Sequence, residues 1–140
     1  MDFVHFDTNT YTAFKLGVPD AKSIVSHAEQ IVMSVIVLGE LRGGFAAGAR
    51  TAQNNRELQE FLGGPRVSVA HITPEVADRY AAIYAQLRHD GRPIPTNDMW
   101  IAAAASMQAH TVLYSLDPHF RYVKGLRLVT NEADFLELDF

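Results

Sequence analysis

The chain has 140 residues and a mass of 15.5 kDa, a size that predicts one domain spanning residues 1–140. Hydrophobic residues make up 48% of it and charged residues 20%, which is typical of a globular protein and excludes a disordered chain. It has no cysteine, so disulfides, thiolate nucleophiles and cysteine-bound zinc are excluded. Its net charge of −4 argues against a broad basic surface that binds nucleic acid non-specifically.

The amino-terminal residues and the longest apolar stretch bear on the location of the protein. Residues 1–4 lack the basic region and apolar core of a signal peptide. The richest apolar stretch, Ile31–Leu38, is interrupted by Ser34 and is much shorter than the roughly 20 residues of a membrane span. We therefore expect a cytoplasmic protein that has no membrane partner.

Five short segments rich in Val, Ile, Leu or Phe predict buried strands, with helical patterns between them. After the first two strands, a stripe of Leu38, Leu41 and Phe45 indicates a helix. Pro74–Arg88 has apolar residues at helical spacing, and Met99–Met107 is apolar nearly all round, which predicts a helix in the middle of the molecule. The five predicted strands are Asp2–Phe6, Ile31–Val35, Val67–His71, Thr111–Tyr114 and Leu126–Val129.

This alternation of strands and helices predicts the fold class. Strands separated by helices imply right-handed crossovers, and hence an α/β fold in which a three-layer α/β/α sandwich surrounds a mainly parallel central sheet. In such a sheet, functional groups gather outside the carboxyl ends of the strands.

Four carboxylates occupy these positions. Asp7 directly follows the first strand, and Glu40 lies in about the first turn of the helix after the second. Asp98 opens the apolar helix, and Asp117 comes three residues after the fourth strand. We therefore expect all four at one edge of the sheet, where their mutual repulsion would raise the pKa of at least one of them.

Clustered carboxylates are most often stabilised by a hard divalent cation. Mg²⁺ and Mn²⁺ prefer oxygen ligands and can activate water beside a phosphate. Without the four acids, the 12 basic residues would balance the remaining 12 acidic ones, so the whole net charge could belong to this site. The pattern therefore favours metal-dependent phosphodiester hydrolysis.

Four segments carry a resemblance to a known family: Phe6-Asp7-Thr8-Asn9, then residues 34–41, 92–103 and 113–117. In this order and spacing they resemble the PIN-domain ribonucleases, and most of all the VapC toxins of type II toxin–antitoxin pairs. The resemblance extends over essentially the whole chain, and residues 91–105 are its most specific part.

The resemblance implies an endoribonuclease that depends on Mg²⁺ or Mn²⁺ and uses an activated water. Asp7, Glu40, Asp98 and Asp117 would be the catalytic, metal-binding acids, and Asn9 an accessory polar group. Ser115 stands where the family often has Thr, and keeps the hydroxyl. His119 stands where many relatives have a further acid. The resemblance also implies a homodimer and a VapB-like antitoxin that inhibits the enzyme.

Three basic residues, Lys15, Arg42 and Arg92, could border the acidic edge and contact RNA phosphates or the antitoxin, although solvated helix ends are an equal alternative. His119 is a weaker candidate for substrate contact. His5 is expected in the core.

Less specific interpretations of the same residues remain open. Asp7, Asn9 and Asp98 could cap helices, Asp117 could begin a turn, and Glu40 could be a solvated helix residue. The chain could also be a catalytically silent module that binds antitoxin or RNA without cutting. A phosphoacceptor signalling domain is disfavoured, because no acidic pair follows the first strand and no Lys follows the last.

Overall fold

The computed structural model describes residues 2–138. Helices separate its successive strands, as the sequence predicts, and two helices lie in each of the first three connections. In order, the elements are β1 (Phe3–Phe6), α1 (Thr8–Lys15), α2 (Pro19–His27), β2 (Gln30–Ser34), α3 (Val35–Ala47), α4 (Thr51–Leu62), β3 (Val67–Ala70), α5 (Pro74–His89), α6 (Thr96–Ala105), β4 (Thr111–Tyr114), a 3-10 helix η1 (Pro118–Tyr122), β5 (Leu128–Val129) and α7 (Glu132–Leu136).

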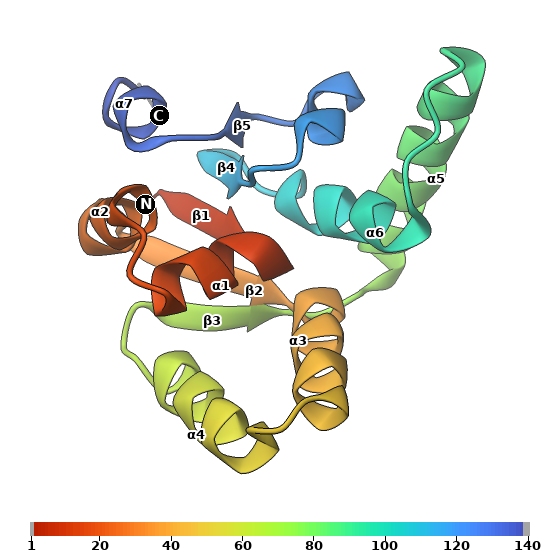
Figure 1. The fold of residues 1–140 in the computed structure, drawn as a ribbon. Coiled ribbons are helices and arrows are strands. Elements are labelled where there is room, and N and C mark those ends of the chain that lie inside the picture. Colours follow the sequence, from red (N-terminus) through yellow and green to blue (C-terminus); the bar gives the residue numbers. More distant parts are fainter. Residues whose placement is uncertain (1, 139–140) are drawn as a thin grey trace.

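The strands form one sheet in the order β3-β2-β1-β4-β5, and every neighbouring pair is parallel (Figure 1). The central strand β1 pairs on both sides, so that Phe3 is opposite Gln30 of β2 and Thr111 of β4. The predicted α/β class with a parallel sheet is therefore confirmed, and the sheet is parallel throughout rather than mainly so.

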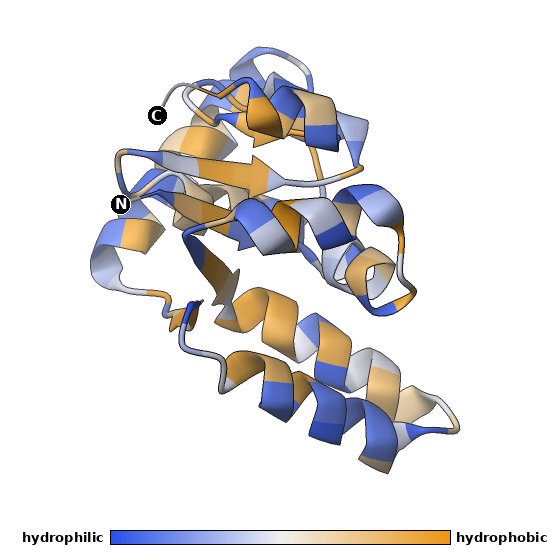
Figure 2. Ribbon diagram, turned by 90° about the vertical axis from the view of Figure 1, so that its left-hand side faces the viewer, coloured by the Kyte–Doolittle hydropathy of each residue, from blue (hydrophilic) through white to orange (hydrophobic). Residues whose placement is uncertain are grey.

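Helices flank the sheet and form the outer layers. From β1 the chain moves in one direction to β2 and β3, and then returns across the sheet to β4. Because right-handed crossovers in opposite directions use opposite faces, this topology assigns α5 and α6 to the other face from α1 and α2. In Figure 2 the helices carry both hydrophobic and hydrophilic positions, as helices that cover a sheet do.

The core lies between the sheet and the helices. Val4, Met33 and Leu113 from the three central strands are at most 1% exposed, as expected for parallel strands covered on both faces. The apolar helix predicted in the middle of the molecule is α6, in which residues 101–105 are buried. It begins earlier and ends earlier than predicted, and Met107 lies outside it with 39% exposure.

Several predicted element bounds differ from the structure. The second strand ends at Ser34, because the Ser34 hydroxyl accepts a hydrogen bond from the Val37 amide and thereby caps α3, so Val35 is helical. The last strand is limited to Leu128–Val129.

Within residues 2–138, no helix combines the length and the apolar character that crossing a membrane requires.

Candidate functional site

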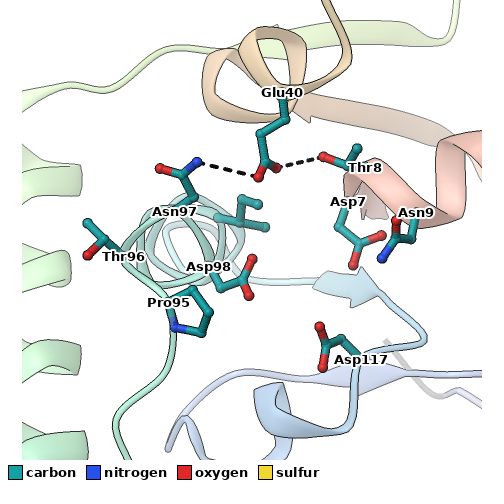
Figure 3. A pocket seen from close by; sticks show the side chains of 10 residues that line it. Asp7, Thr8, Asn9, Glu40, Pro95, Thr96, Asn97, Asp98 and Asp117 are labelled. Atoms are coloured by element: carbon teal, nitrogen blue, oxygen red, sulfur yellow. Dashed lines mark hydrogen bonds between the residues drawn. The ribbon is translucent and has the colours of Figure 1, made fainter. Parts of the chain in front are cut away.

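The acidic residues lie where the chain changes direction in the sheet. Beside β1, the chain continues on one side to β2 and on the other side to β4, so the loops that follow β1 and β4 diverge and leave a crevice. An open pocket of about 530 Å³ lies there. Its lining residues are Asp7, Thr8, Asn9, Glu40, Pro95, Thr96, Asn97, Asp98, Ile101 and Asp117 (Figure 3).

All four predicted carboxylates line this pocket, and Figure 3 shows them pointing into a common space from the junction of β1 and α1, from α3, from α6 and from the segment after β4. The predicted convergence is therefore what the structure shows. Glu40 reaches the pocket from the second turn of α3 rather than the first, since α3 begins at Val35. Asp98 is the third residue of α6 rather than its first.

Asp7 is held rigidly at the base of the pocket. It is only 5% exposed, and its Oδ1 accepts a hydrogen bond of 2.9 Å from the Thr10 amide. In return, the Asp7 amide donates to the Thr10 hydroxyl at 3.0 Å, which completes a capping box at the start of α1. The capping interpretation of Asp7 is thus correct, and the same carboxylate also faces the pocket.

Ser115 connects two of the acids. Its hydroxyl donates to Oδ2 of Asp7 at 2.5 Å and accepts a hydrogen bond from the Asp117 amide at 3.0 Å. The side chain is completely buried, so its contacts exclude water. Ser115 therefore fixes Asp7 and the backbone of Asp117 relative to each other, which gives its hydroxyl a positioning role.

Glu40 is oriented by two hydrogen bonds from other pocket residues. The Thr8 hydroxyl donates to its Oε1 at 2.6 Å, and the Asn97 amide group donates to its Oε2 at 3.4 Å (Figure 3). The carboxylate is partly buried and does not extend freely into solvent. This geometry rules out the interpretation of Glu40 as an unconstrained solvated residue.

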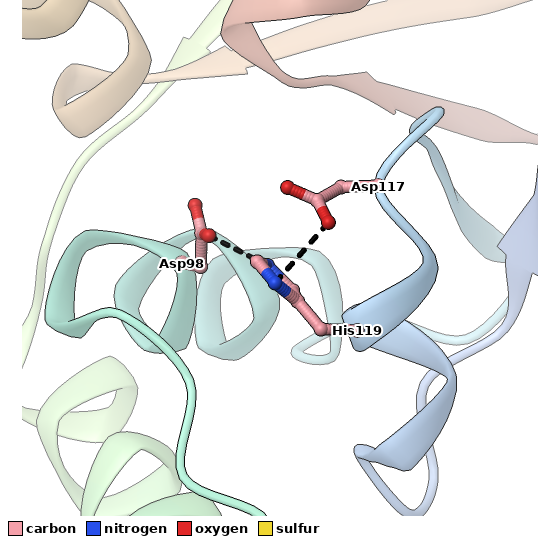
Figure 4. Close-up of side chains that lie close together, drawn as sticks. All are labelled: Asp98, Asp117 and His119. Carbon is pink, nitrogen blue, oxygen red and sulfur yellow. Dashed lines mark ion pairs between the residues drawn. The ribbon is translucent and has the colours of Figure 1, made fainter.

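Asp98 and Asp117 are bridged by His119 (Figure 4). Asp98 makes no capping bond, because the N-cap position of α6 is Pro95. Asp117 occupies the N-cap position of η1 but also makes no side-chain capping bond. The capping alternative therefore fails for Asp98, while Asp117 does begin the turn into η1.

The pKa of Asp98 is raised above its ordinary value. Burial is the largest cause; the adjacent His119 lowers the pKa, and the negative charges of Asp117 and Glu40 raise it again. A raised pKa within the acidic group agrees with the sequence-based expectation. Its main cause differs, since desolvation outweighs the repulsion between like charges.

The other predicted contact residues are distributed differently. Asn9 lines the pocket, whereas Lys15, Arg42 and Arg92 do not. Lys15 lies 3.9 Å from Glu57 on α4, and Arg42 donates to the Asn55 side chain, also on α4. The Arg92 guanidinium lies over the ring of Tyr122, 4.5 Å from its centroid.

The sequence pointed to Ser115 and His119, but three other residues that hold the acids in place, Thr8, Thr10 and Asn97, were not predicted for that role. Thr10 belongs to an Asp-x-x-Thr spacing that indicates a capping box, so a signal for it was present. For Thr8 and Asn97, the only sequence signal of a place in the site was that each is adjacent to a predicted acid, Asp7 or Asp98. The position of His119 between two acids depends on the 3-10 turn, which no hydrophobic periodicity reveals.

Comparison with known proteins identifies the family. A family model described as the PIN domain matches residues 4–140. The chain belongs to the PIN domain family. Ribonuclease VapC5 of Mycobacterium tuberculosis is 25% identical to this PIN domain over 133 residues, which cover 95% of this chain and 85% of the relative.

Solved structures show the same fold. VapBC-1 from nontypeable Haemophilus influenzae has a chain that is 27% identical, with a TM-score of 0.77 over 91% of this PIN domain and 96% of that chain. VapBC2 from Rickettsia felis, bound to a DNA fragment from the promoter, gives a TM-score of 0.77 at 23% identity, with 91% and 97% coverage. The latter match supports the fold alone.

The donor groups of this PIN domain suit a divalent cation. Asp98, Asp117 and His119 each offer one ligand atom, and these three atoms lie within 4.8 Å of one another. Carboxylate oxygens from Asp7 and Glu40 face the same pocket. This oxygen-rich set matches the ligand preference of Mg²⁺ and Mn²⁺.

Proposed function

We propose that this protein is a Mg²⁺- or Mn²⁺-dependent endoribonuclease and the toxin of a type II toxin–antitoxin pair. Asp7, Glu40, Asp98 and Asp117 would be its metal-site residues. The observation that carries the proposal is the convergence of these four carboxylates in one pocket at the strand ends of a PIN fold.

Each acid would have a distinct supporting arrangement. Asp7 is immobilised by Thr10 and Ser115, so it can hold a fixed oxygen toward the cation. Glu40 is oriented by Thr8 and Asn97. Such fixed groups avoid reorganisation during the reaction, which is the main protein contribution to catalysis at polar sites.

The charge of the pocket explains why a cation is needed. Four clustered carboxylates would repel the phosphodiester of RNA. A bound divalent cation would supply charge neutralisation, polarisation of the phosphoryl group and a lower pKa for water. Such a charge would stabilise the ionised form of Asp98, whose pKa is raised by burial and by the charges of Asp117 and Glu40.

The proposed partners follow from the relatives. Among the solved structures that resemble this chain, VapBC-5 from Mycobacterium tuberculosis is described as a member of the VapBC family of toxin–antitoxin systems, and another is a toxin–antitoxin complex from Klebsiella pneumoniae. We propose a VapB-like antitoxin that covers the acidic pocket, a homodimer in solution, and RNA as the substrate in the cytoplasm. Asn9 would contact the substrate or the cation from the pocket wall, while Lys15, Arg42 and Arg92 would contact RNA or antitoxin only outside the pocket.

The deciding experiment compares Asp98→Asn with the wild-type protein on total cellular RNA in the presence of Mg²⁺ or Mn²⁺. We expect discrete RNA fragments from the wild type and none from Asp98→Asn, with both circular dichroism spectra alike. Asp78→Asn is the matched control, because Asp78 is an exposed residue of α5 outside the pocket and should leave cleavage intact.

Full cleavage by Asp98→Asn, or by the wild type in excess chelator, would contradict the proposal. Binding of RNA or antitoxin by a wild-type protein that never cuts would instead support the silent-module alternative.

A further inference from the structure

The imidazole of His119 lies between the carboxylates of Asp98 and Asp117 (Figure 4). Its Nε2 is 2.6 Å from Oδ2 of Asp98, and its Nδ1 is 3.1 Å from Oδ1 of Asp117. All three side chains are partly buried, with exposures of 25% for His119, 20% for Asp98 and 35% for Asp117. The ring therefore belongs to the acidic site rather than to the outer surface.

The contact with Asp98 is close but is not a well-aligned hydrogen bond. Nε2 of His119 is shielded from solvent and has no hydrogen-bond partner of good geometry among the residues that the structure describes. A buried polar nitrogen without such a partner is costly, and a bound ion is one of the ways in which that cost is relieved. One imidazole nitrogen and one carboxylate oxygen each from Asp98 and Asp117 lie within 4.8 Å of one another, which is close enough for them to share a metal ion.

The local structure fixes this ring. His119 is the second residue of η1, directly after Pro118, and the next residue, Phe120, is only 1% exposed and anchors the turn. The rings of His119 and Phe120 pack edge to face with centroids 5.0 Å apart. The imidazole is thus held in position by the fold, as a ligand needs to be.

We propose that His119 is a ligand of the divalent cation together with Asp98 and Asp117, and that its nitrogen makes the site prefer Mn²⁺ to Mg²⁺. This inference rests on the proposed function, in which the cation serves RNA cleavage. Mg²⁺ binds oxygen ligands almost exclusively, whereas imidazole nitrogen suits transition metals. Compared with a set of three carboxylates, a set of two carboxylates and one imidazole also has less negative charge, which weakens the attraction for Mg²⁺ in particular.

The test measures Mn²⁺ and Mg²⁺ binding to the metal-free, full-length protein by isothermal titration calorimetry. We compare the wild type with His119→Ala and His119→Asp. His119→Ala should weaken Mn²⁺ binding at least about tenfold, a loss seen even when only a hydrogen-bond partner of a metal ligand is removed. Mg²⁺ binding should change less, so the ratio of the two Kd values should shift toward Mg²⁺.

His119→Asp provides a second, conservative variant that supplies an oxygen in place of the nitrogen. It should bind Mg²⁺ more tightly than the wild type does and lose the preference for Mn²⁺. His89→Ala is the matched control, because His89 is exposed at the end of α5 and should leave both Kd values unchanged.

An unchanged ratio of Mn²⁺ to Mg²⁺ affinity in His119→Ala or His119→Asp would overturn the inference. Asp98→Asn, titrated in parallel, distinguishes a failure of the proposed role of His119 from a failure of the metal site itself. If Asp98→Asn loses metal binding while the His119 variants keep the wild-type ratio, only the role of His119 fails. If Asp98→Asn binds both metals as the wild type does, the metal site and the proposed function fail together.

Discussion

At the scale of the residue, the Asp7 carboxylate has a structural role that is compatible with its proposed role in metal binding. Asp7 caps α1 through Thr10 and at the same time presents its carboxylate to the pocket. A helix cap needs a fixed side-chain oxygen at a strand–helix junction, and a metal site at the carboxyl end of a strand needs the same. Evidence that an acid caps a helix is therefore no argument against its function.

His5, in the central strand, gives a residue-scale prediction about pH. It is 5% exposed, as the sequence predicts for a core residue, and burial lowers its pKa to about 4 from the ordinary 6.5. The unfolded chain therefore binds a proton at a higher pH than the folded chain. The stability that neutral His5 contributes is present above pH 6.5 and is lost as the pH falls toward 4, by roughly 3 kcal/mol in total.

Replacing His5 by Leu removes this proton linkage. Urea unfolding of the wild type and His5→Leu at a series of pH values should give a smaller loss of stability in the variant between pH 6.5 and 4. The exposed His89→Leu is the control and should follow the wild type. Parallel pH profiles for the wild type and His5→Leu would show that His5 is not the group responsible.

At the scale of the element, the sequence predicts well whether a segment is a helix or a strand, and it predicts poorly the residue at which each element ends. The hydrophobic period and Pro74 place α5 correctly, and the helix ends at His89, one residue beyond the predicted end at Arg88. The end of β2 depends instead on the Ser34 hydroxyl, which caps the next helix, and the hydrophobic pattern does not reveal this cap. Arg42 faces α4 because α3 and α4 pack together, and Lys15 at the end of α1 also lies near Glu57 of α4; strand and helix patterns leave such contacts between helices open.

The capping box of α1 is the element-scale feature that can be tested. Thr10→Val keeps the shape of the side chain but leaves the Asp7 amide without its hydroxyl acceptor and Oδ1 without one contact at 2.9 Å. Because Thr10 is fully buried, we expect a loss of about 1–3 kcal/mol in the free energy of unfolding. Metal affinity should fall with it, since Asp7 loses its fixed orientation.

Thr12→Val is the matched control on the same helix. Thr12 is exposed, and its hydroxyl donates to the Thr8 carbonyl of the same helix, so the change should cost no more than about 0.5 kcal/mol. Denaturation by urea measures both variants. Equal midpoints for Thr10→Val and Thr12→Val would mean that the capping box does not stabilise the start of α1.

At the scale of the whole molecule, topology explains why the acids could be found from the sequence. They come from four distant segments, yet a parallel sheet brings every strand end to one edge, and the reversal of direction beside β1 opens the crevice there. The match of the family model to residues 4–140 supports the proposal that the chain is one domain. What topology leaves undetermined is the arrangement of the side chains around the acids, including His119.

The same long-range assembly predicts how metal affects the stability of the whole fold. Only the folded chain brings the four carboxylates together, so a cation that binds them stabilises the native state by linkage. At a metal concentration one hundred times Kd, the gain is about 2.7 kcal/mol, which corresponds to a rise of several degrees in Tm.

Thermal unfolding of the metal-free protein across a Mn²⁺ titration measures this rise. Asp98→Asn should abolish most of it, while Asp78→Asn should keep it in full. A Tm that stays constant in millimolar Mn²⁺ and Mg²⁺ would show that the converging acids do not form a binding site, because a ligand specific for the folded state must raise the Tm.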